Sequence, residues 1–382
     1  QPWKTGLPVD FRPADSFRLF PPRHWIRRTR RALFGDYGFT GKYKTHPDPN
    51  QEAFFFGLVK ECLDKGVFGE DLLRDEMAKN HLRHDALDVL EAITPIHPNR
   101  DALAISQDRF LEKNFLTRIG LKTAPYSAVE TAADLDLAID QIGTPAILKT
   151  RRMGYDGKGQ MVLRDPEDRE RAWQKLGDAE LILEAFVPFD AECSLVGVRG
   201  ADGDTRFWPL TQNVHDRGIL ALSRPGSFER ALQADAEARM TRLMDHFDYR
   251  GVLTIEFFFC GGELLANEIA PRVHNSGHWT IDGSDCSQFE NHVRAVAGMP
   301  LGRTNRAQHA LMFNWIGSMP DRERALAVPG LHWHEYGKAP RPGRKIGHAT
   351  LTADDHGELM ANAGRLAELA GGVFPGLVQR LD

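Results

Sequence analysis

The sequence predicts a mixed α/β protein built from α+β lobes, and three observations support this fold class. From Leu87 onward, segments with helical periodicity alternate with short strand-like segments that turn-forming residues separate. The chain has 382 residues, which is too long for one ordinary core and indicates about two or three domains. Its residues are 42% hydrophobic and 26% charged, a balance typical of soluble globular proteins.

The overall composition excludes several classes of protein. A net charge of −5 gives no reason to expect nucleic acid or an acidic membrane as a partner. The longest strongly apolar stretch, Ala53–Val59, is far shorter than the ~20 residues that a membrane span needs. The cysteines form no CxxC pair, which argues against a disulfide framework or a thiolate zinc site and predicts a cytoplasmic protein. They are Cys62, Cys193, Cys260 and Cys286.

The elements of the first part of this α/β region follow from local signals. Helical periodicity runs over Asp101–Ile119 and stops at Gly120, a usual C-terminal helix signal. Thr131 has the residue type of an N-cap for a helix that runs to Ile142. Pro145–Thr150 is predicted as a strand and Met161–Arg164 as its partner across a glycine-rich loop.

The second part alternates further strands with helices. Gly261 and Gly262 separate two apolar runs, which predicts a hairpin. After Pro300 the sequence is rich in turn-forming residues, and a short helical stretch precedes Gly371. The predicted strands are Glu180–Val187, Glu192–Arg199, Arg206–Asn213, Val252–Cys260 and Glu263–Ala270, and the predicted helices are Phe228–Phe247 and Ser287–Ala297.

Residues 1–86 differ in character from the rest of the chain. Prolines punctuate this segment, and five arginines between Arg23 and Arg31 form a local basic cluster. Such a cluster could bind phosphate or nucleic acid, but a solvated basic face is the more common role. With the net negative charge of the chain, we predict neither a nucleic-acid nor a membrane partner.

The most informative segment is the glycine-rich stretch from Lys149 to Gln160. A lysine ends an apolar strand, and three glycines follow on a loop. Glycines let backbone N–H groups approach an anion closely, and Lys149 and Lys158 supply compensating positive charge. The pattern is neither a P-loop nor a dinucleotide-binding fingerprint. We favour a phosphate-binding lid over the alternative of a flexible turn.

A pair of carboxylates and a polar loop follow further along the chain. Glu256 and Glu268 lie on the two strands of the apolar hairpin, where buried like charges repel unless a cation or a proton lies between them. Mg²⁺ suits oxygen ligands of this kind, and the alternative is an ion pair with a residue such as Arg272. The polar loop after Glu268 suits a phosphate or a carboxylate intermediate, whereas basic residues near the C-terminus are a weak signal. The loop residues are Arg272, His274, Asn275, Ser276 and His278, and the basic residues are Lys338, Arg341, Arg344 and Lys345.

These segments together resemble a known superfamily. The lysine and glycine loop, the Glu-Ala-Phe-Val run at 184–187 and the paired glutamates resemble an ATP-grasp domain. More narrowly, the segments 153–160, 267–280, 336–338 and 341–348 resemble the 5-(carboxyamino)imidazole ribonucleotide synthetase family, over about residues 87–380. The resemblance implies an atypical N-terminal region (1–100), an ATP-grasp domain (101–298, with a lid subdomain at about 123–187), a β-rich C-terminal domain (299–382) and a homodimer. The glycine-rich turn with which the family begins does not occur in residues 1–86, which are therefore either divergent or a foreign or frame-shifted stretch.

The resemblance also implies roles for individual residues. Lys149, Asp156 and Arg272 would be catalytic, and Glu256 and Glu268 would bind Mg²⁺ or Mn²⁺. The residues implied to contact ATP are Arg109, Lys149, Gly154, Tyr155, Asp156, Gly157, Lys158, Gly159, Gln160, Glu184, Ala185, Phe186, Val187, Glu192, His215, Asn267 and Glu268. Among them, Glu184 and Val187 would hold the adenine at a strand edge, and Glu192 would bind the ribose hydroxyls. Those implied to face the ribonucleotide or bicarbonate are Tyr155, Asp156, Arg272, His274, Asn275, Ser276, Lys338, Arg344 and Lys345.

The activity implied by the resemblance is an ATP-dependent carboxylation in purine biosynthesis. Bicarbonate attacks the γ-phosphate of ATP, and the resulting carboxyphosphate, or CO₂ from it, carboxylates the amine of 5-aminoimidazole ribonucleotide. The alternatives are another ATP-grasp ligase, similar to formate-dependent glycinamide ribonucleotide transformylase or to biotin carboxylase, and a catalytically impaired nucleotide-binding homologue. A nucleic-acid binder that uses the arginine cluster ranks below these.

Overall fold

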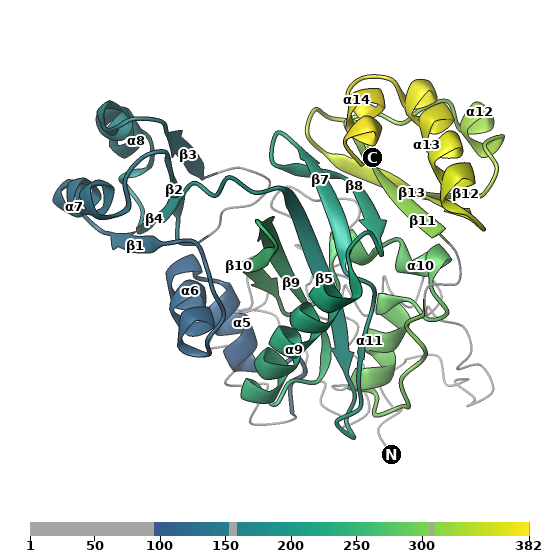
Figure 1. The fold of residues 1–382 in the computed structure, drawn as a ribbon, viewed down its shortest axis with the longest axis horizontal. Helices are drawn as coiled ribbons and strands as arrows, with labels where there is room; N and C mark the ends of the chain where they lie inside the picture. The colour runs from purple at the N-terminus through teal and green to yellow at the C-terminus, as the bar shows by residue number, and fades with distance from the viewer. Residues whose placement is uncertain (1–94, 153–158, 306–308, 382) are drawn as a thin grey trace, which may run out of the picture.

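The computed structural model describes residues 95–152, 159–305 and 309–381, and these residues form two β-sheets with helices packed on them (Figure 1). The smaller sheet has four strands in the order β1-β4-β2-β3. The larger sheet has the order β10-β9-β5-β7-β8-β11-β13-β12, and β6 pairs with β5. The named strand pairs of both sheets are antiparallel. The prediction of a mixed fold of α+β lobes is confirmed, whereas the predictions for residues 1–94 lie outside the described residues.

The four-stranded sheet forms a small lobe that stands apart from the main body in Figure 1. Thr131 starts its first helix as predicted: its hydroxyl accepts the N–H of Asp134, whose carboxylate accepts the N–H of Thr131. Apolar side chains of both helices and of all four strands form the core of the lobe. The elements are β1 (Tyr126–Val129), α7 (Ala132–Ile142), β2 (Ala146–Thr150), β3 (Gln160–Leu163), the 3₁₀ turn η4 (Pro166–Asp168), α8 (Arg169–Leu176) and β4 (Leu181–Ala185).

The larger sheet begins directly after this lobe and runs to the C-terminal part of the chain. Its strands are β5 (Ala191–Arg199), β6 (Thr205–Phe207), β7 (Thr211–Asp216), β8 (Ile219–Pro225), β9 (Gly251–Cys260), β10 (Glu263–Ala270), β11 (His309–Ile316), β12 (Leu331–Glu335) and β13 (Lys345–Ala353). The helices are α5 (Arg100–Ser106), α6 (Arg109–Arg118), α9 (Arg230–His246), η5 (Asn275–Gly277), α10 (Thr280–Gly283), α11 (Gln288–Val296), α12 (Arg322–Leu326), α13 (His356–Ala370), α14 (Phe374–Val378) and η6 (Gln379–Leu381).

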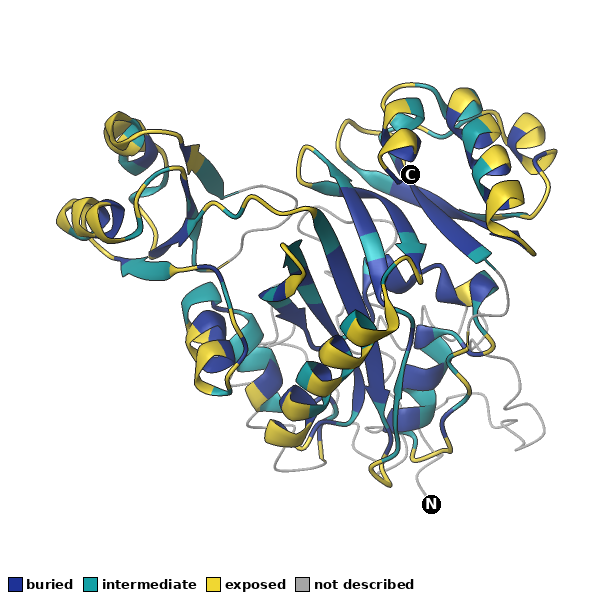
Figure 2. Cartoon of the chain, in the orientation of Figure 1, coloured by how far each residue is buried: buried dark blue, intermediate teal, exposed yellow. Residues whose placement is uncertain are grey.

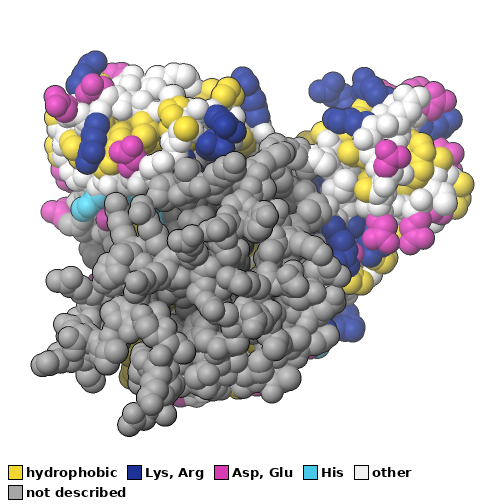
Figure 3. Space-filling model, turned by 180° about the vertical axis from the view of Figure 1, so that it is seen from behind, with side chains coloured by type: hydrophobic (Ala, Val, Ile, Leu, Met, Phe, Trp, Pro, Cys, Tyr) yellow, Lys and Arg dark blue, Asp and Glu magenta, His cyan; other side chains and the backbone are white. Residues whose placement is uncertain are grey.

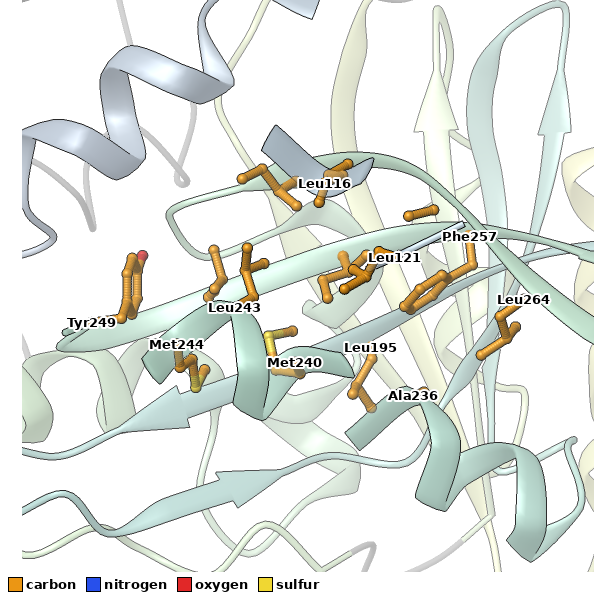
Figure 4. Close-up of a cluster of buried hydrophobic side chains, with 14 of the residues drawn as sticks. Leu116, Leu121, Leu195, Ala236, Met240, Leu243, Met244, Tyr249, Phe257 and Leu264 are labelled. Atoms are coloured by element: carbon orange, nitrogen blue, oxygen red, sulfur yellow. The ribbon is translucent and has the colours of Figure 1, made fainter. Parts of the chain in front are cut away.

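A hydrophobic core holds strands β5, β9 and β10 against helices α5, α6 and α9. Figure 4 shows Met240 of α9 near Leu195 of β5, and Leu243 and Phe257 belong to the same cluster. The strands are largely buried, while the helices expose one side to solvent (Figure 2). Burial of each large apolar side chain stabilises the fold by about 1.5–3 kcal/mol, so this core fixes the strands that carry the two glutamates.

The C-terminal strands continue the same sheet. Strand β11 pairs with β8 on one side and with β13 on the other, so the larger sheet crosses residue 299, the predicted start of the C-terminal domain. A separate core packs α12, α13 and α14 against β8, β11 and β13. The domain bounds stay a prediction.

Three element predictions differ from the structure. The helix predicted over Asp101–Ile119 is two helices, because the carboxylate of Asp108 accepts the N–H groups of Phe110 and Leu111 and so starts α6 anew. The strand predicted over Arg206–Asn213 is two strands, β6 and β7, with Pro209 between them, where a ladder donor is absent. The helix expected before Gly371 ends there, at Ala370, but it has 15 residues and is not short, and the segment after Pro300 also contains three strands.

Candidate active site

The glycine-rich segment is anchored by the β2–β3 hairpin. Lys149 pairs with Gln160, and the N–H of Thr150 donates to the carbonyl of Gly159 (2.8 Å). Gly159 has a φ of 70°, and a Cβ atom there would lie 2.6 Å from Thr150 Oγ1. This position therefore requires glycine. The lid residues Gly154, Tyr155, Asp156, Gly157 and Lys158 lie outside the described residues.

Lys149, near the end of β2, points at a buried carboxylate. Its Nζ lies 3.0 Å from Glu184 Oε2 on the neighbouring strand β4. Burial lowers the pKa of Lys149 below its ordinary value; the charge of Glu184 opposes this effect, and the charge of Lys113 adds to it. Burial acts in the opposite direction on Glu184, but Lys149 and Lys113 hold the pKa of Glu184 below its ordinary value. The structure thus joins two predicted ATP contacts in one ion pair.

Lys113 is a site residue that the sequence analysis missed. Its Nζ lies 3.4 Å from the same Glu184 oxygen and donates to the carbonyl of Asn267 (2.7 Å). Arg109 lies one helical turn before Lys113 on α6, and its charge contributes to the lowered pKa of Glu184. A second basic residue one turn after a predicted ATP contact was the signal that could have found Lys113.

The strand predicted to hold the adenine leaves the small lobe at its junction with the larger sheet. The N–H of Ala185 donates to the carbonyl of Pro125, and that of Phe186 donates to the carbonyl of Pro145. Phe186 is 43% exposed, so it can contact a ligand that lies beside the strand. Binding of adenine along Glu184–Val187 stays a prediction.

Glu192 and His215, which the resemblance implied as separate ATP contacts, form a pair. Glu192 on β5 lies beside β7, and its Oε2 is 2.8 Å from His215 Nδ1. Burial alone would lower the pKa of His215, but the hydrogen bond and charge of Glu192 raise it above its ordinary value. The pair provides a carboxylate and an imidazole next to each other at the edge predicted to hold the ribose.

The two glutamates predicted to bind a metal lie directly opposite each other. Glu268 of β10 is in register with Glu256 of β9, beside a bulge at Asn267. Burial would raise the pKa of Glu256, but His274, His215 and Arg272 together hold it at about 2. Paired carboxylate oxygens of this kind fit Mg²⁺.

The alternative ion pair with Arg272 is not what the described residues show for Glu256. His274 Nε2 lies 2.9 Å from Glu256 Oε1, whereas Nη1 of Arg272 donates to the carbonyl of Val273. Burial and the charge of Glu268 raise the pKa of Glu112 well above its ordinary value. This third carboxyl group, on α6, accepts the N–H of Ile269 beside Glu268.

The polar loop is held by a buried hydrogen-bond network. The N–H of Ser276 is directed at His274 Nδ1 (3.3 Å), so Nδ1 accepts and Nε2 carries the proton that is donated to Glu256. The hydroxyl of Ser276 contacts Ser194 on β5 (2.6 Å), which in turn accepts from Asn213 on β7. This network fixes the loop against the sheet that carries Glu256.

The predicted C-terminal substrate residues approach the polar loop from β13 and its neighbourhood. Lys345 Nζ donates to the side-chain carbonyl of Asn275. Lys338 and Lys345 both lie over the ring of Tyr336, at 5.3 and 5.5 Å from its centroid. Arg344 donates to the carbonyl of Ala339. The structure therefore brings Lys345 to the loop, whereas Lys338 shares with it only the ring of Tyr336, and Arg344 bonds within its own turn.

A second group of ligating side chains, which the sequence analysis did not single out, lies nearby. Asp282, His334 and His348 place ligand atoms within 4.8 Å of one another. His334 Nε2 is 2.8 Å from Asp282 Oδ2, and its ring stacks on that of His348 at 4.3 Å and 8°. An ion equidistant from both rings would lie outside the plane of each, so this geometry favours a hydrogen-bonded cluster over a metal centre.

The charge on one face of the small lobe is mixed. Seen from behind, this lobe carries both acidic and basic side chains (Figure 3). Among residues 95–381, with their gaps, the structure contains no helix that is long and apolar enough to cross a bilayer.

Family models match most of the part of the chain that carries this site. Residues 114–289 match the ATP-grasp domain, and residues 310–362 match the phosphoribosylaminoimidazole carboxylase C-terminal domain. With the lysine at the glycine-rich hairpin and the paired glutamates on β9 and β10, these matches define an ATP-grasp protein.

Similar proteins narrow this class. The N5-carboxyaminoimidazole ribonucleotide synthase of Pseudomonas aeruginosa is 52% identical over 280 residues, which cover 73% of this chain and 77% of that protein. The crystal structure of the Thermus thermophilus synthetase has a TM-score of 0.72 at 48% identity and covers 75% of this chain and 79% of that chain. The crystal structure of the Aspergillus clavatus enzyme, in complex with ADP and 5-aminoimidazole ribonucleotide, has a TM-score of 0.70 at 29% identity. The match covers 76% of this chain and 80% of that chain. This chain belongs to the N5-carboxyaminoimidazole ribonucleotide synthase family, which confirms the predicted family, ATP-grasp fold and ligase class.

Proposed function

We propose that this chain is an ATP-dependent carbon–nitrogen ligase that carboxylates 5-aminoimidazole ribonucleotide with bicarbonate in purine biosynthesis. The supporting observation in the structure is the single cluster around Lys113. This lysine bonds to Glu184, the partner of Lys149, and to Asn267, the neighbour of Glu268. The predicted phosphate contact and the predicted metal ligand therefore lie on two sides of one buried side chain.

The first stage is transfer of the γ-phosphoryl group from ATP to bicarbonate, which yields ADP and carboxyphosphate. The cationic groups near the site, Lys149 and Arg109, neutralise the charge that develops on the phosphoryl oxygens. Glu256 and Glu268 would hold Mg²⁺, which binds phosphate oxygens and neutralises part of their charge. The ion is a proposal that rests on the carboxylate pair.

The second stage is capture of the carboxyl group by the exocyclic amine of the ribonucleotide: the new N–C bond forms, the bond from carbon to the phosphate oxygen breaks, and inorganic phosphate and a proton are released. The polar loop from Arg272 to Ser276 supplies donors for bicarbonate or carboxyphosphate, and Lys345 bonds to Asn275 of that loop. His274 holds one proton between its ring and Glu256, so its side chain is fixed before substrate binds. Closure of the 154–160 segment over this region would keep water from the labile intermediate.

Three finer features belong to the same proposal. The cofactors are ATP and Mg²⁺, with Mn²⁺ as a substitute ion. The partners are the small-molecule substrates and a second copy of the chain, and the location is the cytoplasm.

A panel of substrates tests this function. ADP formation from Mg·ATP is measured with bicarbonate and 5-aminoimidazole ribonucleotide, with formate and glycinamide ribonucleotide, and with bicarbonate and biotin. We expect ADP formation to be stimulated only by the first combination. Stimulation by formate or biotin instead would assign the chain to another ATP-grasp reaction, and binding of ATP without any stimulated turnover would mean an impaired homologue.

A further inference from the structure

Lys113 is a buried cation that the proposed chemistry does not yet use. Its side chain is 2% exposed, on the face of α6 that packs against β10. A buried ammonium group is costly unless charge and hydrogen bonds compensate it. The compensating groups come from both sheets: the Glu184 carboxylate from the four-stranded sheet and the Asn267 carbonyl from the nine-stranded sheet.

The Asn267 carbonyl lies on the edge strand of the larger sheet, at a point where the ladder between β9 and β10 is irregular. The register passes from Ala266 to Glu268, so Asn267 is the extra residue of a bulge. Helix α6 supplies hydrogen-bond partners to the backbone on both sides of Glu268. Lys113 donates to the carbonyl of Asn267, and Glu112 accepts the N–H of Ile269. Consecutive residues of one helix thus fix the backbone around a predicted metal ligand.

Glu184 carries one negative charge and has two positively charged neighbours. Two ammonium groups, those of Lys113 and Lys149, share the single oxygen Oε2. Lys149 is the more accessible of the two, with 13% of its side chain exposed, and it lies on β2 just before the predicted phosphate lid. If Lys149 turns from Glu184 to a phosphate, Lys113 remains as the counter-ion of the carboxylate.

We propose that Lys113 is a positioning residue for phosphoryl transfer: it neutralises Glu184, so that Lys149 is released to the phosphates, and it fixes the bulge that orients Glu268. This role rests on the proposed function. Lys113 acts through Lys149 and Glu268 and contacts neither phosphate nor metal itself.

The test uses the full chain with Lys113→Met, which removes the charge at similar length, and Lys113→Arg, which keeps it. Lys122→Met is the matched control, because it breaks an exposed ion pair with Glu263 (2.7 Å) on β10. With bicarbonate and ribonucleotide saturating, we expect Lys113→Met to lower kcat/KM for ATP by about tenfold or more and to raise the half-saturating Mg²⁺ concentration. KM for the ribonucleotide should change by less than about twofold, Lys113→Arg should recover part of the loss, and the control should match wild type.

A suppressor variant separates this role from a merely structural one. If Lys113 acts by neutralising Glu184, then Glu184→Gln removes the charge that retains Lys149 and should restore part of the activity lost in Lys113→Met. The double variant replaces the buried ion pair between Lys113 and Glu184 with two neutral side chains, so it stays informative if Lys113→Met alone does not fold. Lys149 loses its partner in this variant, but 13% of its side chain is exposed to solvent. A lower melting temperature of Lys113→Met with unchanged kinetics for ATP and Mg²⁺ would overturn the proposal. So would a loss of activity in the double variant equal to the sum of the losses in the two single variants.

Wild-type protein reports on the proposed function separately. Absence of ribonucleotide-stimulated ADP release in wild type would contradict the proposed function, and calorimetric binding of Mg·ATP to the same variants would then test Lys113. An active wild type with Lys113→Met indistinguishable from it would defeat only the role of Lys113.

Discussion

Strand β9, which carries Glu256, is tied at its start to helix α11 by a buried histidine whose charge state should make stability depend on pH. His292 is fully buried, and its Nδ1 accepts the N–H of Val252 (3.1 Å). Its Nε2 has no hydrogen-bond partner among the described residues. Burial lowers the pKa of His292 from 6.5 to about 4. The folded protein therefore holds this imidazole in its neutral form.

The lowered pKa sets both the sign and the size of the effect. Because the folded pKa lies below the unfolded one, the stabilisation is complete above the ordinary value of 6.5 and is lost as the pH falls towards about 4. At ~1.4 kcal/mol for each pKa unit, His292 alone should lower the free energy of unfolding by about 2 kcal/mol between about pH 7.5 and about pH 5.

Urea unfolding followed by tryptophan fluorescence measures this change. His292→Gln cannot titrate, so although it loses packing at both pH values, its free energy of unfolding should fall by about 2 kcal/mol less than that of wild type on acidification. His246→Gln, at an exposed position on α9, is the control and should follow the wild-type pH dependence. Parallel pH curves for wild type and His292→Gln would refute the reasoning.

The remaining predictions concern the site. Because the pKa of Lys149 is lowered, its charge is lost at a lower pH than that of an ordinary lysine, so ATP affinity should fall early on the alkaline side. Lys149→Arg, which stays protonated, should move this fall to higher pH, and titrations with Mg·ATP that show identical pH profiles would argue against it. Glu256→Gln and Glu268→Gln should each raise the half-saturating Mg²⁺ concentration by about tenfold or more, whereas Glu263→Gln, exposed on β10, should not. Equal Mg²⁺ dependence in all three variants would mean that the glutamates do not hold the ion.

Features that depend on local sequence could be predicted. The start of α7 at Thr131 follows from a capping residue, and the pairing of β2 with β3 follows from two apolar runs on either side of a glycine-rich segment. The two-residue turn at Gly261 and Gly262 predicts that the strands pair, but its register alone would place Asn267 opposite Glu256. The bulge at Asn267, which the sequence does not reveal, brings Glu268 opposite Glu256.

Features that depend on distant partners could not be predicted. The position of Lys113 one helical turn after Arg109 pointed to the site, but its burial depends on Glu184 and Asn267, which tertiary packing brings to it. The choice of His274 rather than Arg272 as the partner of Glu256 is likewise a matter of loop geometry. The resemblance implied strands in the C-terminal part, but the positions of β11 and β13 could not be assigned because these strands pair across a long connection and lie between turn-rich segments.

The central claim, that bicarbonate rather than water accepts the phosphoryl group, is tested most directly with bicarbonate labelled with oxygen-18. Inorganic phosphate released during turnover with Mg·ATP and 5-aminoimidazole ribonucleotide is analysed by mass spectrometry. Attack by bicarbonate leaves one of its oxygens on phosphorus, so the phosphate should carry the label, and its release should depend on the ribonucleotide. Unlabelled phosphate would mean that water attacks ATP, and it would contradict the proposed carboxylation through carboxyphosphate.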